Sequence, residues 1–312
     1  MKKIFLTFIA IITLFSLTAC SLLVYERPQI SIKEPTVGSQ NEPEPTDTKP
    51  TESVSEDPDK IFAQPTLNEQ IIYNQNNIIV TVVGIEYDGW FGPELLLLIE
   101  NNSEKNITVQ ARNSSVNGYM IDFQTSTDVV AGKKAYGDIV IPNNSLKMAN
   151  IDTIANIEFS LHIFESTSYD AIADSNQISL STNVASPYIQ TYDDSGVALY
   201  DENGIRIIAK GFSLDSNFFG PELILYIENN ADKYITIQTR DTSVNGFMID
   251  SIMSDEVLPG KKIMGLMTFS SSRLEESKVT DIETIETVFH IFDTDTWDTI
   301  IDTDPITINF EK

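Results

Sequence analysis

Cysteine, histidine and tryptophan are scarce in this chain of 312 residues, which contains one cysteine, two histidines and two tryptophans. A single cysteine cannot form an intramolecular disulfide, so apolar cores must stabilise the folded parts. His162 and His290 each lie alone in an apolar stretch, where we expect hydrogen-bonded structural roles within strands. Without clustered imidazole or thiolate ligands, a zinc site rich in His or Cys is excluded.

Positive charge is also scarce, because 20 Lys and Arg residues oppose 46 Asp and Glu residues, a formal net charge of −26. Nucleic-acid binding needs clustered Lys and Arg to neutralise phosphates, so we expect no nucleic-acid partner. A chain this acidic should not lie flat on an anionic membrane either. The charge favours solubility and weak attraction of cations.

The compact motifs of common enzymes are absent. The chain has no G-x-S-x-G, no H-E-x-x-H and no glycine-rich phosphate loop. Paired glutamates such as Glu94 and Glu100 follow from the acidic composition, and without a cleft they do not indicate glycosidase chemistry. We therefore expect a protein that is not an enzyme, with no catalytic residues and no cofactor.

The first 19 residues have the pattern of an export signal. Lys2 and Lys3 precede an apolar run over residues 4–17. A run of about 14 residues suits the core of a signal peptide and is short for a membrane span.

The apolar run ends in Leu17-Thr18-Ala19-Cys20, which contains the single cysteine of the chain. These residues resemble the lipobox of bacterial lipoproteins. The resemblance implies cleavage between Ala19 and Cys20 and a diacylglyceryl group on the Cys20 thiol, with palmitate as an expected acyl chain. An ordinary secretory signal and an uncleaved anchor are the alternatives. Because two acyl chains anchor stably, we expect a lipid-anchored protein on the extracytoplasmic face of the cell membrane.

The following segment, residues 20–66, has the composition of a disordered tether. Seven prolines fall between Pro28 and Thr66, mixed with Ser, Thr, Glu and Asp. Such a segment buries too little apolar surface to offset its ordering entropy, and prolines and like charges extend it. We predict a spacer that holds the rest of the chain away from the membrane.

The remainder of the chain is a duplication. Residues 91–122 and 219–250 are identical at 22 of 32 positions, and the offset of 128 continues towards the end of the chain. A unit of about 115 residues is the size of a domain and far longer than a solenoid repeat. We therefore predict a signal peptide (1–19), a lipidated tether (20–66) and two domains, at 67–185 and 196–312.

Within each unit the pattern is mostly that of β-strands. Residues 77–84 are a β-branched run, and Asn117-Gly118 and Asn245-Gly246 supply the two positive φ angles of type I′ hairpin turns. A capping box at residues 272–275 predicts one helix in the second unit. Seven or so short strands with such turns indicate an all-β fold of two tandem antiparallel β-sandwiches, with a small barrel as the alternative.

Both units share the segments IENN and SVNG, a Gly-Lys-Lys turn and a late His-Ile-Phe strand. Together these segments resemble an uncharacterised immunoglobulin-like (Ig-like) domain that is common in lipoproteins and other surface proteins of Gram-positive bacteria. The resemblance covers roughly residues 69–182 and 197–310. It implies a secreted Ig-like module and carries no catalytic residues.

One candidate for ligand binding is the loop with Tyr87, Asp88 and Trp90, because its sequence differs between the two units. Loops vary while the scaffold holds, and aromatic rings beside a carboxylate can stack on a sugar or a peptide. The alternative is an aromatic plug at the junction of two strands. We expect the neighbouring Phe91 and its counterpart Phe219 to lie in the core.

A second candidate is the acidic run with Asp293, Asp295, Asp298 and Asp304. The first, second and last of these occupy positions one, three and twelve of an EF-hand-like count. However, Asp298 stands where that loop requires glycine. Weak calcium binding is one hypothesis, and an acidic, solvated connection between two late strands, with Trp297 packed over the edge, is the alternative.

These expectations favour a non-catalytic binding or adhesion role through the tandem Ig-like domains. The partner would be an extracellular protein or an envelope glycan, and the membrane would be contacted through the lipid on Cys20. A structural spacer or assembly module of the cell envelope, with no small ligand, is the alternative. A uniformly polar surface would favour the spacer, whereas an apolar patch would favour a protein partner.

Overall fold

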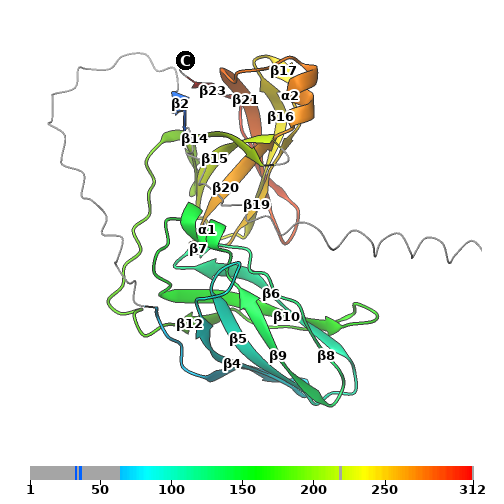
Figure 1. The fold of residues 1–312 in the computed structure, drawn as a ribbon. Coiled ribbons are helices and arrows are strands. Elements are labelled where there is room, and N and C mark those ends of the chain that lie inside the picture. Colours follow the sequence, from blue (N-terminus) through cyan, green and yellow to red (C-terminus); the bar gives the residue numbers. More distant parts are fainter. Residues whose placement is uncertain (1–31, 34, 37–63, 218–219, 311–312) are drawn as a thin grey trace, which may run out of the picture. The chain divides into compact units, whose positions relative to one another are not determined.

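The computed structural model describes residues 32–33, 35–36, 64–217 and 220–310, and these are almost entirely β-structure (Figure 1). The predicted signal peptide, with Ala19 and Cys20, and most of the predicted tether lie outside the described residues. Within them, no helix is long and apolar enough to cross a membrane. We call residues 67–185 repeat 1 and residues 196–312 repeat 2.

Repeat 1 is built from two antiparallel groups of strands. The first is the four-stranded sheet β3 (Gln70–Gln75), β4 (Ile78–Glu86), β5 (Glu94–Asn101) and β9 (Lys133–Val140), paired in that order. The second comprises β6 (Ile107–Val116), β7 (Tyr119–Met120), β8 (Thr127–Val129), β10 (Asn156–Glu165), β11 (Ala171–Asp174) and β12 (Ile178–Ser181). In Figure 1, β4, β5 and β9 lie side by side in one layer, and β6 and β10 in the other.

Repeat 2 has the same topology. The first group comprises β13 (Val197–Glu202), β14 (Ile205–Asn217), β15 (Gly220–Asn229), β18 (Ser251–Ile252) and β20 (Lys262–Phe269). The second comprises β16 (Ile235–Val244), β17 (Phe247–Met248), β19 (Ser254–Val257), β21 (Thr284–Asp293), β22 (Thr299–Asp302) and β23 (Ile306–Phe310). The predicted all-β fold of two tandem antiparallel sandwiches is confirmed.

Alternation of side chains places the core between the two groups of each repeat. In β5, Leu95, Leu97 and Ile99 are buried while the residues between them are only partly covered. Across the repeat, Phe159 of β10 is fully buried in the same cluster. Each large apolar side chain buried in this way stabilises the fold by ~1.5–3 kcal/mol, so no disulfide is required.

The shared IENN and SVNG segments are structural. Asn101, at the end of β5, is fully buried and donates hydrogen bonds to the carbonyl oxygens of Lys105 (2.7 Å) and Val129 (2.9 Å). Asn117 accepts from the backbone N–H groups of Ala155 (2.9 Å) and Asn156 (3.0 Å). Their counterparts Asn229 and Asn245 in repeat 2 make the equivalent bonds, so these asparagines satisfy backbone groups at the same places in both repeats. The predicted turns are confirmed, with positive φ at both Asn117 and Gly118.

Each repeat also contains one short helix, α1 (Asn143–Met148) in repeat 1 and α2 (Ser271–Glu276) in repeat 2. The predicted helix in repeat 2 exists, but its predicted capping box is wrong, because Ser270 is the N-cap and makes no side-chain capping bond. No capping signal precedes α1, since Pro142 stands at its N-cap. Leu146 and Leu274 are the buried residues that hold the two helices in place.

Part of the predicted tether is paired with repeat 2. The short strand β1 (Ile32–Lys33) pairs with β14 at Ser213 and Phe212, and β2 (Pro35–Thr36) pairs with β23. The prediction of disorder is therefore wrong for these four residues. A composition average over the whole segment hides one short stretch with β-branched residues.

The reason for this pairing lies in the edge of repeat 2. In repeat 1, Thr66 fills the equivalent position by exchanging hydrogen bonds with Asn183 at 2.9 and 3.0 Å. In the linker before repeat 2, Gln190 and Tyr192 instead bond to Asn117 of repeat 1. The edge beside β23 is thus left for β2, and an unpaired edge is a template for any extended segment.

Deletion of residues 31–36 from the full chain should therefore expose this edge. We expect amide hydrogen exchange at Phe212, Ser213 and Asn309 to accelerate by roughly tenfold or more, because these residues pair with β1 and β2 and local opening would no longer break those strand pairs. Deletion of residues 41–46 shortens the segment equally and serves as the control. Unchanged protection after the first deletion would show that the pairing contributes nothing in solution.

Candidate functional site

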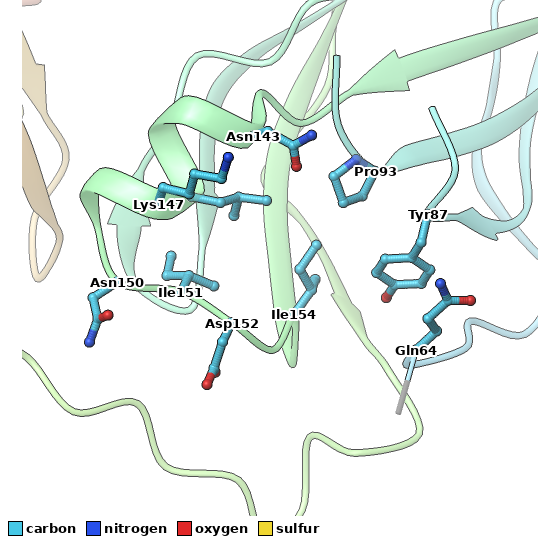
Figure 2. Close-up of a pocket in the computed structure, with 10 residues that line it drawn as sticks. Gln64, Tyr87, Pro93, Asn143, Lys147, Asn150, Ile151, Asp152 and Ile154 are labelled. Atoms are coloured by element: carbon cyan, nitrogen blue, oxygen red, sulfur yellow. The ribbon is translucent and has the colours of Figure 1, made fainter. Parts of the chain in front are cut away.

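A cavity of about 670 Å³ lies beside α1 in repeat 1 (Figure 2). It is lined by Gln64, Tyr87, Pro93, Asn143, Leu146, Lys147, Asn150, Ile151, Asp152 and Ile154. These residues come from the segment before β3 (Gln64), from the β4–β5 loop, from α1 and from the segment between α1 and β10. We call this cavity the Tyr87 pocket.

The Phe-Gly-Pro segment holds one wall of the Tyr87 pocket in place. The N–H of Ile141 donates to the carbonyl of Pro93 (2.8 Å), and the N–H of Asn143 donates to the carbonyl of Phe91 (2.9 Å). Gly92 lies between these two bonds with φ of 150°, and a Cβ atom there would lie 2.0 Å from the Ile141 oxygen. Glycine is therefore required for the β4–β5 loop to lie against the start of α1.

The pocket combines an apolar floor with a polar rim. Leu146, Ile151 and Ile154 are buried and form the floor, whereas the lysine, aspartate and amide side chains around it are exposed. Figure 2 shows Tyr87 facing this space, with Gln64 next to it. Sites for organic ligands typically have this apolar lining with a few polar groups.

Tyr87 contributes an unusual group to this wall. Its hydroxyl is buried and has no hydrogen-bond partner among the described residues. Burial raises the pKa of Tyr87 to about 12, so the phenol is neutral and can donate a hydrogen bond at physiological pH. A buried polar atom without a partner costs free energy, and a ligand that accepts from it would recover that cost.

The structure separates the three residues of the predicted ligand loop. Tyr87 lines the pocket, while Asp88 and Trp90 are exposed and do not line it. Trp90 is 90% exposed, which rules out the alternative reading of this residue as an aromatic plug. The prediction that Phe91 lies in the core is wrong, because its side chain is 65% exposed and only its backbone is anchored; Phe219 lies outside the described residues.

Sequence reasoning missed the part of the rim that follows α1. Lys147, Asn150 and Asp152 line the pocket, and the corresponding residues of repeat 2 are Glu275, Lys278 and Thr280. The floor positions are apolar in both copies, for example Leu146 and Leu274. A comparison of the two copies beyond the β4–β5 loop would have found this divergent rim on a constant floor.

The acidic run of repeat 2 forms the turn between β21 and β22. Asp293 accepts hydrogen bonds from the N–H groups of Asp295 (3.0 Å) and Thr296 (3.2 Å), and its other oxygen lies 3.2 Å from the Lys233 ammonium. Lys233, together with these N–H groups, lowers the pKa of Asp293. The carboxylate of Asp293 therefore stabilises the turn between β21 and β22.

The other members of that run do not join Asp293. Asp295, Asp298 and Asp304 are exposed, and Asp298 accepts from the hydroxyl of Thr296 (2.9 Å). The Trp297 ring stacks on Phe292 with centroids 5.5 Å apart, as the alternative reading expected. Throughout the described ranges, no three His, Cys, Asp or Glu side chains are grouped to hold a metal ion.

The two histidines have the predicted structural role. The Nδ1 atom of His162 lies 2.6 Å from Asp174, and that of His290 lies 2.6 Å from Asp302, in each case across a pair of antiparallel strands. Both imidazoles are buried. Each pair therefore links two late strands of its own repeat.

Asp255 of β19 is half-buried, and within the described ranges its carboxylate has no counter-ion. Its Oδ2 atom has no hydrogen-bond partner in the described part of the chain. Burial, together with a smaller contribution from the negative charge of Asp122, raises the pKa of Asp255 to about 7. The equivalent residue of repeat 1 is Thr127, so the second copy carries a charge where the first carries a hydroxyl.

Comparisons with known proteins give neither a family nor a function. No protein-family model and no curated protein matches this chain. Among solved structures, the YadV chaperone is 11% identical with a TM-score of 0.23, and the match covers 75% of this chain and 100% of that chain. A protein of unknown function from Porphyromonas gingivalis W83 is 11% identical with a TM-score of 0.18, and the match covers 70% and 89% of the two chains.

A further match is the CsuC–CsuE chaperone–tip adhesion subunit pre-assembly complex from archaic chaperone-usher Csu pili of Acinetobacter baumannii. It is 13% identical with a TM-score of 0.19, and the match covers 69% of this chain and 90% of that chain. Similarity at these TM-scores supports no inference about fold or function. The fold is described by the strand pairing given above, and the function has to be argued from the site.

Proposed function

We propose that this chain is a lipid-anchored protein of the extracytoplasmic face that binds a partner without transforming it, and that the Tyr87 pocket is its recognition site. The anchor in this proposal rests on the lipobox-like sequence that ends in Cys20. The Pro-rich segment after it gives the reach to present the two repeats away from the membrane. The binding role rests on the pocket.

The observation that carries the binding role is the unpaired Tyr87 hydroxyl above an apolar floor. The lining includes one carboxylate, of Asp152, and one ammonium, of Lys147, surrounded by amides. This set suits recognition of a protein segment. An apolar side chain would occupy the floor, and backbone groups of the segment would bond to the amides and to Tyr87.

A second candidate partner is an envelope glycan. Trp90 is 90% exposed and lies three residues from Tyr87 on the same loop. An exposed indole beside a pocket with amide groups is a surface on which a sugar ring can stack. In this case Trp90 supplies the platform and the pocket rim supplies the hydrogen bonds.

The test uses the full chain as bait against envelope and culture extracts of a Gram-positive bacterium. In the test variant, four rim residues are replaced by those of repeat 2: Tyr87→Leu, Lys147→Glu, Asn150→Lys and Asp152→Thr. These changes leave the net charge unaltered. We expect retention of the partner to fall at least tenfold, about the effect of losing one buried polar contact. In the same preparation, Cys20→Ser should move the chain from the membrane fraction to the soluble fraction.

The matched control places repeat 2 residues in the β10–β11 turn, Thr167→Asp and Tyr169→Trp, which do not line the pocket. A species retained equally by the rim variant and the wild type would place recognition elsewhere. Absence of any retained species at high bait concentration would favour the spacer. Loss of a retained glycan on Trp90→Ala would identify the second candidate.

A further inference from the structure

The β6–β7 hairpin of repeat 1 docks on repeat 2. The N–H of Lys262 donates to the carbonyl of Gly118 (3.0 Å), and Tyr119 pairs in parallel with Lys262 of β20. A 12-stranded sheet thereby runs from one repeat into the other. The side chain of Tyr119 is only 2% exposed.

Apolar packing and one ion pair accompany this contact. The Tyr119 ring lies 6.4 Å from that of Tyr226, in an edge-to-face arrangement. Met264 of β20 packs against the same apolar cluster that fills repeat 1. At the side of the contact, the Lys261 ammonium pairs with the carboxylate of Glu158.

Among the residues that the structure describes, none docks on the same hairpin of repeat 2. Phe247 and Met248 correspond to Tyr119 and Met120, and they are 50% and 68% exposed. A Cβ atom placed on Gly246 would meet no atom within 4 Å, so the hairpin tip is open. We call Asn245–Met248 the donor hairpin.

The corresponding acceptor in repeat 1 is also open. In the described residues, β9 is the last strand of its sheet, and beyond β5 it has only a single bridge, from Val140 to Gln124. Tyr136, which corresponds to Met264, is 78% exposed. We call the edge of β9 at residues 133–136 the acceptor edge.

The ion pair of the internal contact has an unused counterpart on these two surfaces. Lys133 on the acceptor edge corresponds to Lys261, and Glu286, beside the donor hairpin, corresponds to Glu158. Both side chains are exposed, and within the described ranges neither has an ion-pair partner. The two open surfaces therefore match in backbone edge, apolar side chains and charge.

We infer that the donor hairpin of one copy docks on the acceptor edge of a second copy, so that chains associate head to tail. The contact repeats the geometry of the internal contact between repeats 1 and 2. Such a heterologous contact extends into linear arrays unless the rotation between copies closes a ring. It is weaker than the internal contact, because Leu98 replaces Tyr226 and no linker joins the copies.

Sedimentation of the full chain at ~10 µM to ~1 mM tests this inference, a range suited to weak association. The chain carries Cys20→Ser so that acyl chains do not aggregate it. We expect the mean mass to exceed that of two copies at the upper concentrations. Lys133→Glu and Glu286→Lys should each weaken association roughly tenfold, because each places like charges across the contact.

Mixing the two variants is the decisive measurement. In an equimolar mixture every contact between unlike chains pairs a lysine with a glutamate, so association should return to the wild-type level. Glu202→Lys, an equal charge reversal at the exposed end of β13, is the control and should have no effect. A wild type that stays monomeric throughout, or a mixture that associates no better than either variant, would overturn the inference.

Discussion

Replacement of Gly92 by alanine should destabilise repeat 1 by about 3–5 kcal/mol, the range of severe single substitutions. The new Cβ would lie 2.0 Å from the carbonyl oxygen of Ile141 and 2.9 Å from the N–H nitrogen of Asn143. Both are backbone atoms, and the N–H groups of Ile141 and Asn143 hold this backbone by hydrogen bonds to the carbonyls of Pro93 and Phe91, so no flexible side chain can move aside. Relief requires breaking these bonds, which also displaces the wall of the Tyr87 pocket.

Substitutions at two other glycines of repeat 1 separate the steric clash at Gly92 from the strain of a positive φ. Gly132 has φ of 69° but open space around its Cβ position, so Gly132→Ala should cost only about 1 kcal/mol of backbone strain. Gly84 has neither a positive φ nor a neighbour within 4 Å, so Gly84→Ala should be neutral or stabilising by up to ~1 kcal/mol. Urea denaturation of the three variants measures the order of their stabilities. A midpoint for Gly92→Ala equal to that of Gly132→Ala would refute the steric argument.

This steric constraint also explains why both copies carry the glycine of Phe-Gly-Pro. In repeat 2, a Cβ atom on Gly220 would lie 1.9 Å from the carbonyl oxygen of Phe269, the same close approach as in repeat 1. The identical residues of the duplication thus fall where the fold has least freedom: the Gly-Pro approach, the buried Asn101 and Asn229, and the hairpin asparagines.

Alternating patterns and turn chemistry therefore predicted the strands well, because these signals are local. Pairing of neighbouring strands follows once the Asn-Gly turns are placed. The pairing of Ile32–Lys33 with β14 was missed. Whether an edge of repeat 2 is left unpaired depends on how the strands are arranged in the fold, and this arrangement cannot be read from local sequence patterns. The exposure of Phe91 was missed for a similar reason. In the fold its backbone carbonyl accepts a hydrogen bond from Asn143, while its side chain stays exposed.

The candidate site was predicted only in part. Divergence between the copies correctly drew attention to Tyr87, but the rim beyond α1 comes from residues about 60 positions later, and local pattern carries no information on that proximity. Asp293 looked like a ligand by its spacing and is a turn residue by its hydrogen bonds. Spacing alone did not distinguish the two roles.

Replacement of Asp255 by asparagine should stabilise repeat 2 at pH 8 and have little effect at pH 4. The carboxyl has a pKa of about 7 in the folded chain against 3.8 for the ordinary group. The folded state therefore binds more protons than the unfolded state between these values, so stability falls as pH rises from about 4 to 7. Above pH 7 the buried charge costs on the order of 2–4 kcal/mol, and asparagine removes this cost.

Threonine, the residue that repeat 1 carries at this position, should act in the same direction as asparagine, since it is also neutral. Asp138→Asn removes an equal charge from an exposed position of β9 and serves as the control. Urea denaturation between pH 4 and pH 8 gives the difference between each variant and the wild type, which cancels the contributions of other groups. A pH-independent difference for Asp255→Asn would mean that the carboxyl has the same pKa in the folded and the unfolded chain, and that burial does not control its titration.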